Sequence, residues 1–359
     1  MTIRHVELAD FRIFRAASIT PEAEGTTVIA GANGTGKTSV LEALAYLATR
    51  RSFRGAPPEA LVRGGSERAI IRADMDHRDR PTLVETEIVP GGRGRTKVNR
   101  KTATTRAALA EAAPCTVFSP EDLAIIGGGP QGRREVLDDA LALLDPEGAR
   151  AADETERVLR QRAALLRQAG GRATREVETT LDVWDQRLAD IGKVLVAARE
   201  RLVGELEPPV GLTYGALAGS DDPALLRMHY QRSWAGDLLD SLGATRADDV
   251  RRGVNTIGPH RDDLLLVLEG REARTHASQG EQRCAALALR LGLHQLVCAK
   301  TSLVPTVLLD DVFSELDPGR SRALVAELPA GQALLTTAAP LPGGIDVARV
   351  LDVEALERS

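Results

Sequence analysis

The stretch GANGTGKTS, residues 31–39, decides what kind of fold this chain adopts. It satisfies the pattern G-x-x-x-x-G-K-[ST] and lies between an apolar run, residues 27–30, and a helical pattern, residues 39–47. A strand, a glycine-rich loop and a helix in this order form a P-loop, whose backbone N–H groups and helix N-terminus bind phosphate. We therefore predict a nucleotide phosphate site made by Gly31, Ala32, Asn33, Gly34, Thr35, Gly36, Lys37 and Thr38.

An acidic pair follows a second apolar run. Residues 306–309 predict a buried strand, and Asp310 and Asp311 come directly after it, at the carboxyl edge where α/β sheets bind ligands. We expect Lys37 to reach the outer phosphates of ATP, and Thr38 and Asp310 to hold Mg²⁺. Asp311 would then polarise the attacking water. Lys37, Asp310 and Asp311 are the predicted catalytic residues.

Residues 277–283, Ala-Ser-Gln-Gly-Glu-Gln-Arg, open an alanine- and leucine-rich helix. Taken alone, Ser278 is an ordinary helix N-cap. Placed before the acidic pair and followed by Ser314-Glu315-Leu316-Asp317, the segment resembles the signature motif of ABC-type ATPases. There, the serine and the glycine amide bind the γ-phosphate of a nucleotide held by another subunit. Since the chain has one P-loop and one signature, the resemblance implies that Ser278 and Gly280 bind ATP across an ATP-dependent homodimer.

Composition points to an acidic protein with a local basic surface. The formal net charge is −5, yet residues 50–106 hold 14 Arg or Lys against 7 Asp or Glu, which leaves −12 for the rest. The three cysteines form no C-x-x-C pair, which argues against a zinc site and a disulfide framework. The chain has neither a secretory signal at its start nor a window close to the ~20 apolar residues of a membrane span. We expect a cytoplasmic protein with no membrane contact.

The sequence texture changes twice along the chain. A hairpin is predicted over residues 68–89, before a stretch of long helical patterns between about 127 and 250. Within that stretch, Gly170-Gly171 separates two helices and Pro208-Pro209 is expected to end the second. Afterwards the α/β texture returns, with a strand expected at 263–268 and a helix at 281–299.

These changes predict two domains. Lobe I, residues 1–126 and 283–359, would bind ATP and carry the P-loop, the acidic pair and the Ser314–Asp317 loop. Lobe II, residues 127–282, would be mainly helical and carry the signature.

An ordered set of short stretches along nearly the whole chain resembles the RecF family of bacterial recombination and repair proteins. The resemblance implies an α/β fold class: an ABC-type ATPase head with a P-loop α/β lobe and an inserted, mainly helical second lobe, related to the heads of Rad50 and SMC proteins but without a long coiled coil. The stretches are Phe11-Arg12, Gly31 to Thr38, Arg51 to Arg54, Phe118 to Leu123, Arg133 to Asp138, Leu159 to Arg162, Gly258 to Asp263, the signature, and Leu308 to Asp317.

The same resemblance implies a function. RecF proteins are DNA-binding clamps of recombinational repair and replication-fork maintenance: ATP drives homodimerisation on double-stranded DNA near junctions with single strands, and slow, DNA-stimulated hydrolysis releases it. They support recombinase loading with RecR and RecO, and the SOS response. By similarity, Arg12 touches the nucleotide. Candidates for DNA phosphate contacts, each with a solvated surface side chain as the alternative, are Arg50, Arg51, Arg54, Arg93, Arg95, Lys97, Arg100 and Lys101.

Two other functions stay open from sequence: the nucleotide-binding subunit of an ABC transporter, and a structural protein that binds ATP without hydrolysing it. The 240 positions from Thr38 to Ser278 are more than we expect of a transporter subunit. Asp311 is one methylene shorter than the glutamate common in transporters, and Thr336-Thr337 stands where they place a switch histidine. Both differences favour slow turnover.

Two further features depart from a simple nucleotide site. Glu281 stands where ABC signatures usually carry glutamine, and we expect it to turn away from the triphosphate or to pair with Arg283. His260, Asp262 and Asp263 surround a Gly-Pro turn, where structural hydrogen bonds are expected more often than a metal site.

Overall fold

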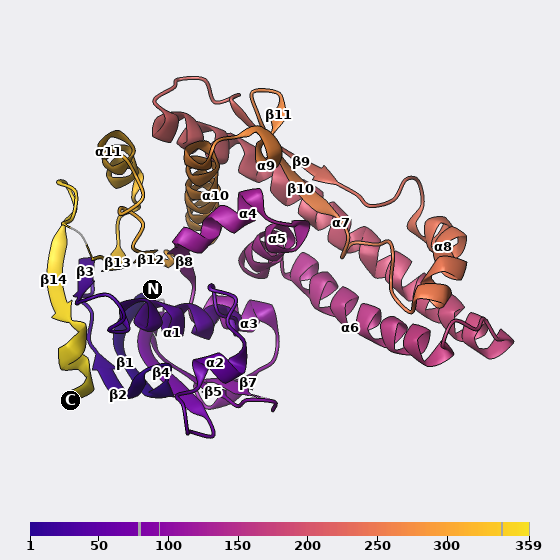
Figure 1. The fold of residues 1–359 in the computed structure, drawn as a ribbon, viewed down its shortest axis with the longest axis horizontal. Coiled ribbons are helices and arrows are strands. Elements are labelled where there is room, and N and C mark those ends of the chain that lie inside the picture. Colours follow the sequence, from indigo (N-terminus) through magenta and orange to yellow (C-terminus); the bar gives the residue numbers. More distant parts are fainter. Residues whose placement is uncertain (78–79, 93, 339, 359) are drawn as a thin grey trace.

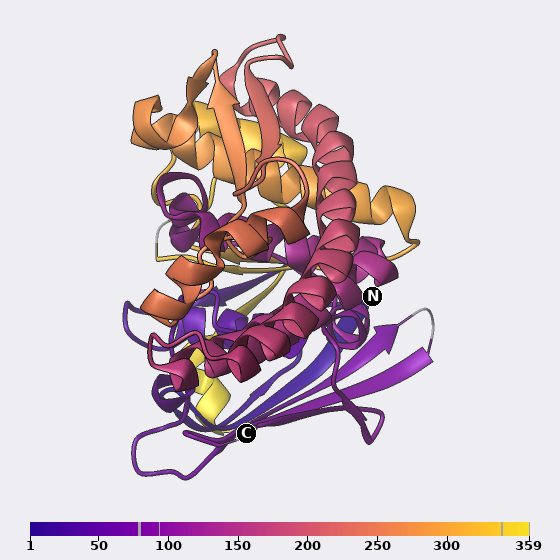
Figure 2. The same ribbon diagram turned by 90° about the vertical axis from the view of Figure 1, so that its right-hand side faces the viewer.

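Three β-sheets and a projecting helical arm make up the protein (Figure 1). The computed structural model describes residues 1–77, 80–92, 94–338 and 340–358. The arm consists of α6, α7 and α8, which extend away from the two larger sheets, and the view in Figure 2 shows α7 curving along the molecule toward its outer end.

The largest sheet is antiparallel and has the strand order β2-β1-β4-β5-β6-β7. The β4–β5 pair confirms the hairpin predicted over residues 68–89. The strands are β1 (Thr2–Phe11), β2 (Phe14–Ile19), β4 (Ala69–His77), β5 (Arg80–Ile88), β6 (Arg95–Val98) and β7 (Lys101–Ala103).

The second sheet is parallel and has the order β14-β3-β13-β12-β8. Every residue of β12 and β13 is buried, as expected of strands covered on both faces, and β12 confirms the predicted strand at residues 306–309. Because β8 and β12 are neighbours, the long helical region leaves this sheet and returns to it. The strands are β3 (Gly25–Ala30), β8 (Cys115–Phe118), β12 (Thr306–Asp310), β13 (Gln332–Thr336) and β14 (Val347–Asp352).

Helix α1 (Lys37–Thr49) lies between these two sheets and is buried nearly all round. Residues 39–48 are all buried. They share one core with Phe11 of the first sheet and with Leu308 and Leu334 of the second. Each such apolar side chain contributes about 1.5–3 kcal/mol when it is removed from water. Both sheets therefore fix the helix that follows the P-loop.

The remaining helices lie mostly in the inserted region. The helix predicted over residues 281–299 is confirmed as α10. The predicted boundary between lobes II and I, at 282/283, lies inside α10, and the division into two lobes stays a prediction. The helices are α2 (Pro58–Leu61), α3 (Arg106–Ala112), α4 (Leu123–Gly127), α5 (Pro130–Leu144), α6 (Pro146–Ala169), α7 (Arg175–Ala218), α8 (Leu238–Arg252), α9 (Ala273–His276), α10 (Gln279–Lys300) and α11 (Pro318–Glu327), with 3-10 turns η1 (Pro120–Asp122) and η2 (Val353–Arg358).

A third sheet, of order β11-β10-β9, interrupts the region that the sequence predicted as helical. Strand β10 (Asp263–Leu268) confirms the strand expected there, and β11 is Arg271–Glu272. Strand β9 (Leu226–Gln231) was missed, since its alternation covers only 6 residues between long helices. Its inward side chains, Leu226 and Met228, join the core that also contains α7 and α10.

The prediction that Pro208-Pro209 ends a helix is wrong, because α7 continues through both prolines for 44 residues in all. Two consecutive prolines remove two backbone donors and crowd the preceding turn, at a cost of about 3 kcal/mol or more. Leu206 and Val210, on either side of the prolines, are fully buried in the main core. Tertiary packing of α7 thus outweighs the local cost.

A buried ion cluster fixes the outer end of the arm. Arg162 of α6 is fully buried and donates Nε to Asp185 of α7, at 2.7 Å, and Nη1 to Asp249 of α8, at 2.6 Å. Asn255 accepts a third hydrogen bond from it, at 2.7 Å. A buried charge that loses its partner costs about 3–5 kcal/mol. The cluster therefore holds the three helices in one arrangement.

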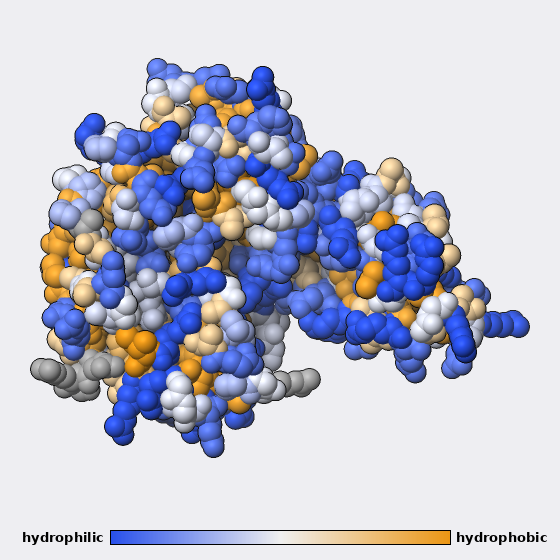
Figure 3. All heavy atoms as spheres, viewed as in Figure 1, coloured by the Kyte–Doolittle hydropathy of each residue, from blue (hydrophilic) through white to orange (hydrophobic). Residues whose placement is uncertain are grey.

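The described helices include none that is both long and apolar enough to cross a membrane. The arm is mostly hydrophilic on the face seen in Figure 3. Cys115, Cys284 and Cys298 are free thiols; Cys284 is buried, and the other two are partly exposed.

Two glycines of α7 give a matched test of the packing. A Cβ at Gly211 would overlap the backbone oxygen of Pro223, whereas a Cβ at Gly204 meets nothing within 4 Å. We expect Gly211→Ala to lower the free energy of unfolding by about 1–3 kcal/mol through overpacking, and Gly204→Ala to raise it by about 0.5–1 kcal/mol. Urea unfolding followed by circular dichroism measures both. Equal effects would show that residues 220–226 do not pack on α7 as described.

Candidate nucleotide-binding site

The loop after β3, the carboxyl end of β13 and the residue after β12 meet at one cavity of about 550 Å³. Most residues of the P-loop line it, together with side chains from both larger sheets. Ala32 and Thr35 do not line the cavity; within the loop, Thr35 Oγ1 donates a hydrogen bond to the Ala32 carbonyl at 2.7 Å. The lining residues are Arg12, Ile13, Asn33, Gly34, Gly36, Lys37, Thr38, Ser39, Arg54, Ala60, Val62, Gly64, Asp311, Thr336 and Ala338.

Glycine is required at two positions of the loop. Gly36 has φ 96°, and a Cβ there would overlap the ring of Phe14. Gly31 has φ 152°, and a Cβ there would overlap the side chain of Val353. The loop is thus held against two neighbouring elements while α1 begins at Lys37 with its N-terminus at the cavity.

The ammonium group of Lys37 is held by the loop itself. Its Nζ donates to the carbonyl oxygens of Gly31, at 2.8 Å, and of Ala32, at 2.9 Å. These contacts keep the lysine at the mouth of the loop, where it can exchange a carbonyl for a phosphate oxygen.

Asp310, at the end of β12, contacts α1 and β13. Its Oδ1 accepts hydrogen bonds from the Thr38 hydroxyl of α1, at 2.8 Å, and from the Thr336 hydroxyl of β13, at 2.6 Å. Burial raises the pKa of Asp310, and the two hydroxyls oppose the rise. A hydroxyl and a carboxylate are hard oxygen ligands that fit Mg²⁺, which also takes phosphate oxygens. Within the described residues, no group of three or more His, Cys, Asp or Glu is arranged to hold a metal alone.

Asp311 has a strained backbone and a buried, unpartnered oxygen. Its φ is 46°, in the left-handed region, and its N–H donates to the carbonyl and hydroxyl oxygens of Thr336, at 3.1 and 3.2 Å. Its Oδ1 is buried and has no hydrogen-bond partner in the described part of the chain. Strain together with an unsatisfied acceptor at a cavity is typical of a functional position.

Two arginines supply positive charge to the cavity. Arg12 donates Nε and Nη2 to the buried carboxylate of Glu42, at 2.7 and 2.6 Å, and Nη1 to the Ala60 carbonyl, at 2.9 Å. Because a guanidinium has five donors, two remain. Arg54, which the sequence suggested as a DNA contact, also lines the cavity and pairs with Glu121 at 3.5 Å.

The signature residues lie elsewhere. Ser278 and Gly280 are not among the residues that line the P-loop cavity within one chain. Ser278 is the N-cap of α10, and its backbone N–H and hydroxyl both donate to Glu281 Oε2 at 2.7 Å. The suggestion that Glu281 pairs with Arg283 is wrong, because Arg283 pairs with Glu315.

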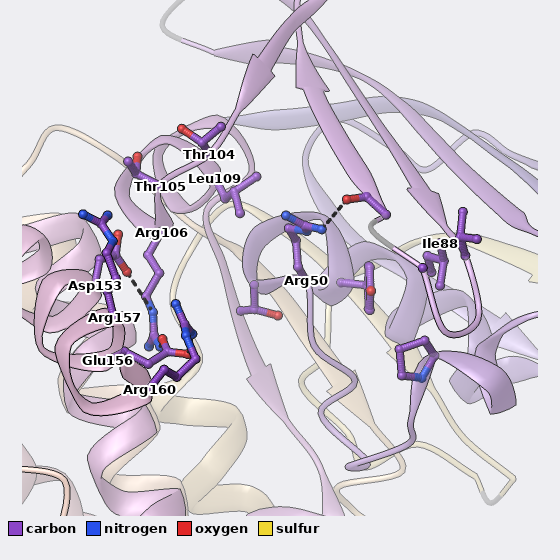
Figure 4. A pocket seen from close by; sticks show the side chains of 16 residues that line it. Arg50, Ile88, Thr104, Thr105, Arg106, Leu109, Asp153, Glu156, Arg157 and Arg160 are labelled. Atoms are coloured by element: carbon purple, nitrogen blue, oxygen red, sulfur yellow. Dashed lines mark hydrogen bonds and ion pairs between the residues drawn. The ribbon is translucent and has the colours of Figure 1, made fainter. Parts of the chain in front are cut away.

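Most of the proposed DNA-contacting arginines are engaged within the chain. Arg51 Nη2 donates to both carboxylate oxygens of Asp139, at 2.5 and 2.6 Å, and Arg95 pairs with Glu87 at 3.5 Å. Arg93 lies outside the described residues. Arg50 borders a second cavity of about 660 Å³ and donates to the Gly94 carbonyl at 2.6 Å. Figure 4 shows it across that cavity from Arg106 and Asp153.

Lys97, Arg100 and Lys101 of the β6–β7 hairpin are the remaining candidates for DNA contacts. All three are exposed, and in the described ranges none makes an ion pair. Asn99 and Arg100 have φ 48° and 68°, as in a two-residue type I′ turn. Asn99 exchanges two hydrogen bonds with Leu83 of β5, at 2.8 and 2.9 Å. The hairpin thus presents its cations on a fixed turn.

The Gly258–Asp263 segment is structural, as expected. The Asp262 carboxylate accepts from Tyr230 Oη, at 2.6 Å, and Asp263 from Arg133, at 2.7 and 2.9 Å. His260 contacts the Asn255 carbonyl at 3.2 Å, and burial lowers its pKa to about 4, so its imidazole is neutral.

Sequence reasoning missed three side chains of this site. Thr336 was singled out only as standing in place of a switch histidine; its contact with Asp310 was missed, although the strand register pairs the two residues. Arg54 was attributed to DNA. Glu42 stands on a helix face that otherwise reads as apolar, and no sequence signal marked it as the partner of Arg12.

Three comparisons place the fold among known proteins. A family model described as "RecF/RecN/SMC N terminal domain" matches residues 2–334. The DNA replication and repair protein RecF of Beutenbergia cavernae is 40% identical over 373 residues, which cover 94% of each chain. A solved structure of the recombination mediator protein RecF-ATP in the RecFOR pathway has a TM-score of 0.84 at 25% identity, over 94% of this chain and 92% of that one.

An SMC head domain from Pyrococcus furiosus shares the fold, with a TM-score of 0.53 at 15% identity over 94% of this chain and 90% of that one. These matches confirm the predicted α/β head. Along the described residues, the longest helical pair is the α6–α7 hairpin of the arm, and no long coiled coil extends from it.

Asp310→Asn tests the cost of burying the Asp310 carboxylate. A carboxyl whose folded-state pKa is raised destabilises the fold once it ionises, so the penalty is absent below its ordinary pKa of 3.8 and complete above the folded-state pKa. Asparagine keeps the oxygen that accepts from Thr38 and Thr336. At pH 7 without nucleotide or metal, we expect the variant to raise Tm by about 2 °C for each ~1 kcal/mol relieved, and the difference to vanish as the pH falls toward 4.

Differential scanning calorimetry measures both Tm values, with exposed Asp221→Asn as the control. With Mg²⁺ and ATP the order should reverse, because the parent alone keeps the charged ligand. An unchanged Tm at pH 7 would show that burial of the Asp310 carboxylate does not destabilise the fold.

Proposed function

The chain belongs to the RecF family, and from this membership we propose that it is an ATP-dependent DNA-binding clamp of recombinational DNA repair and replication-fork maintenance. One observation carries the proposal: Lys37, Thr38 and Asp311 line one cavity, whereas Ser278 lies outside it on the same chain. The family membership also favours this function over a transporter subunit.

The chain's own groups would hold ATP and Mg²⁺ at the P-loop. The loop amides and the α1 N-terminus bind phosphate oxygens, and Lys37 exchanges its two loop carbonyls for the outer phosphates. Thr38 and Asp310 hold Mg²⁺ through oxygens already 2.8 Å apart. Arg12, oriented by Glu42, and Arg54 add positive charge at the same cavity.

Hydrolysis would be slow and stimulated by DNA. Bound ATP would supply the γ-phosphate, which is transferred to water when the bond between the β- and γ-phosphates is broken. In this proposal Asp311, which lines the cavity and whose Oδ1 has no hydrogen-bond partner in the described residues, accepts a proton from the attacking water. Its short side chain and the absence of histidine at Thr337 both favour a long-lived ATP state, which a clamp needs.

A homodimer would complete the site. Since Ser278 and Gly280 do not line the cavity of their own chain, a second copy facing the first would supply them. Two copies related by a two-fold axis would enclose two ATP molecules in equivalent sites.

Double-stranded DNA near junctions with single strands is the proposed substrate surface. Lys97, Arg100 and Lys101 are the side chains best placed to contact phosphates, because they are exposed and unpaired in the described residues. As in the family at large, we propose that the protein acts in the cytoplasm with RecR and RecO in recombinase loading and supports the SOS response.

Sedimentation velocity with and without Mg-ATP tests the dimer. Ser278→Arg should keep ATP binding by the monomer but raise the protein concentration at half-dimerisation at least about tenfold, because each ~1.4 kcal/mol lost is a factor of ten. Lys37→Ala should lose both ATP affinity and dimerisation. Ser302→Arg, at an exposed serine after α10, is the control. A parent that stays monomeric at saturating ATP would overturn the shared site.

Binding of a duplex with a single-stranded tail, measured with ATP across a salt series, tests the DNA surface. Each lost phosphate contact reduces the slope of log K against log salt by about 0.9, so Arg100→Ala and Lys101→Ala should each flatten it by about that amount. Arg15→Ala removes one exposed charge from β2, at the opposite edge of the same sheet, and is the matched control. Equal slopes in all variants would remove the hairpin from the DNA surface.

A further inference from the structure

A charged corner lies where α10 and α11 begin. Ser278 caps α10 and Asp317 caps α11, accepting from the backbone N–H groups of Gly319 and Arg320 at 2.9 and 3.0 Å. These two caps bring the side chain of Arg320 to the first turn of α10.

Arg320 lies directly against Gly280. A Cβ at Gly280 would overlap the Arg320 guanidinium, so a larger residue there would push the end of the arginine side chain aside. About a third of the Arg320 side chain, 34%, is exposed, and its one ion pair within the described residues is a 3.5 Å contact with Asp317. The guanidinium therefore keeps donors for another anion.

Glu281 occupies the same corner from inside the chain. Its Oε2 accepts from both the backbone N–H and the hydroxyl of Ser278, at 2.7 Å each, and these hydrogen bonds lower its pKa. Arg320 adds a smaller attraction to the same carboxylate. The Glu281 carboxylate thus occupies the two Ser278 donors that a phosphate oxygen would otherwise bind.

Resting on the ATP-bridged dimer proposed above, we propose that Arg320 is a further nucleotide-binding residue. With Ser278 it receives the terminal phosphate of the ATP held by the P-loop of a second copy of the chain, and Glu281 is the internal carboxylate that this phosphate displaces.

The chemistry of the exchange favours a triphosphate. A guanidinium fork matches phosphate oxygens, and the N-terminus of α10 adds partial positive charge. A terminal phosphate brings more oxygens and more negative charge than one carboxylate, so it can replace Glu281. A diphosphate on the facing P-loop lacks that group and leaves Glu281 in place. Arg283, one turn further on, is already paired with Glu315.

The Arg320→Ala variant tests whether Arg320 binds the nucleotide of the partner copy rather than the nucleotide of its own chain. Binding of a fluorescent ATP analogue at low protein concentration should stay within about twofold of the parent. Sedimentation velocity with Mg-ATP should show the half-dimerisation concentration raised about a hundredfold, because a charge-assisted contact is worth about tenfold and the dimer contains two such corners. Arg320→Lys should fall between the two. Arg322→Ala, an exposed arginine on the same helix, should match the parent.

Glu281→Gln tests the displaced carboxylate. The amide oxygen can still accept from Ser278, but the competing charge is gone, so half-dimerisation should occur at about tenfold lower protein concentration. Glu327→Gln, at the end of α11, removes the same charge away from the corner and should change nothing.

The outcomes separate the two proposals. A parent that does not dimerise with ATP, or a Ser278→Arg variant that dimerises normally, overturns the shared ATP site and this inference with it. If the parent dimerises and Ser278→Arg does not, a folded Arg320→Ala that dimerises like the parent overturns the role of Arg320 alone. Loss of ATP binding by the Arg320→Ala monomer would also overturn it, and a weaker Glu281→Gln dimer would overturn the exchange. Circular dichroism confirms the fold of each variant.

Discussion

The hydrogen bond from the Thr38 hydroxyl to Asp310 joins residues 272 positions apart, and the site depends on it. Thr38 belongs to the first turn of α1, and Asp310 is the last residue of β12. They meet only because β12 pairs with β8 on one side and β13 on the other, after the whole helical region has left the sheet and returned. Burial of α1 between two sheets then leaves its N-terminus no freedom to move away.

Buried ion pairs fix the geometry of the inserted region, alongside its apolar core. Arg133, nearly fully buried, binds Asp263 and the carbonyls that end α4, and Arg199 binds Asp138 through two hydrogen bonds of 2.9 Å. Arg162 does the same for the arm. Because such pairs are costly to separate but add little net stability, their effect is to define one geometry. That geometry determines the direction in which α10 and its N-cap, Ser278, point.

Some basic side chains are paired within the chain, and others are exposed without an ion pair in the described residues. Arg51 and Arg95 are neutralised within the chain, and Arg12 is oriented by a buried carboxylate. The cations that the two proposals use lie on the β6–β7 turn and at the start of α11. A family clamp would use the first for DNA and, as we propose, the second for the nucleotide of its partner, so the two surfaces do not compete for the same groups.

The sequence by itself determined the P-loop, the acidic pair, the buried strand before it and the main helices, because each depends on residues that are close along the chain. It missed β9 and ended α7 at Pro208-Pro209, since local preferences favour a helix break and only the core around Leu206 and Val210 overrides them. The sequence also could not tell which arginines are free. Ion pairs such as Arg51–Asp139 and contacts such as Arg320–Gly280 join distant segments, so only the tertiary structure decided them.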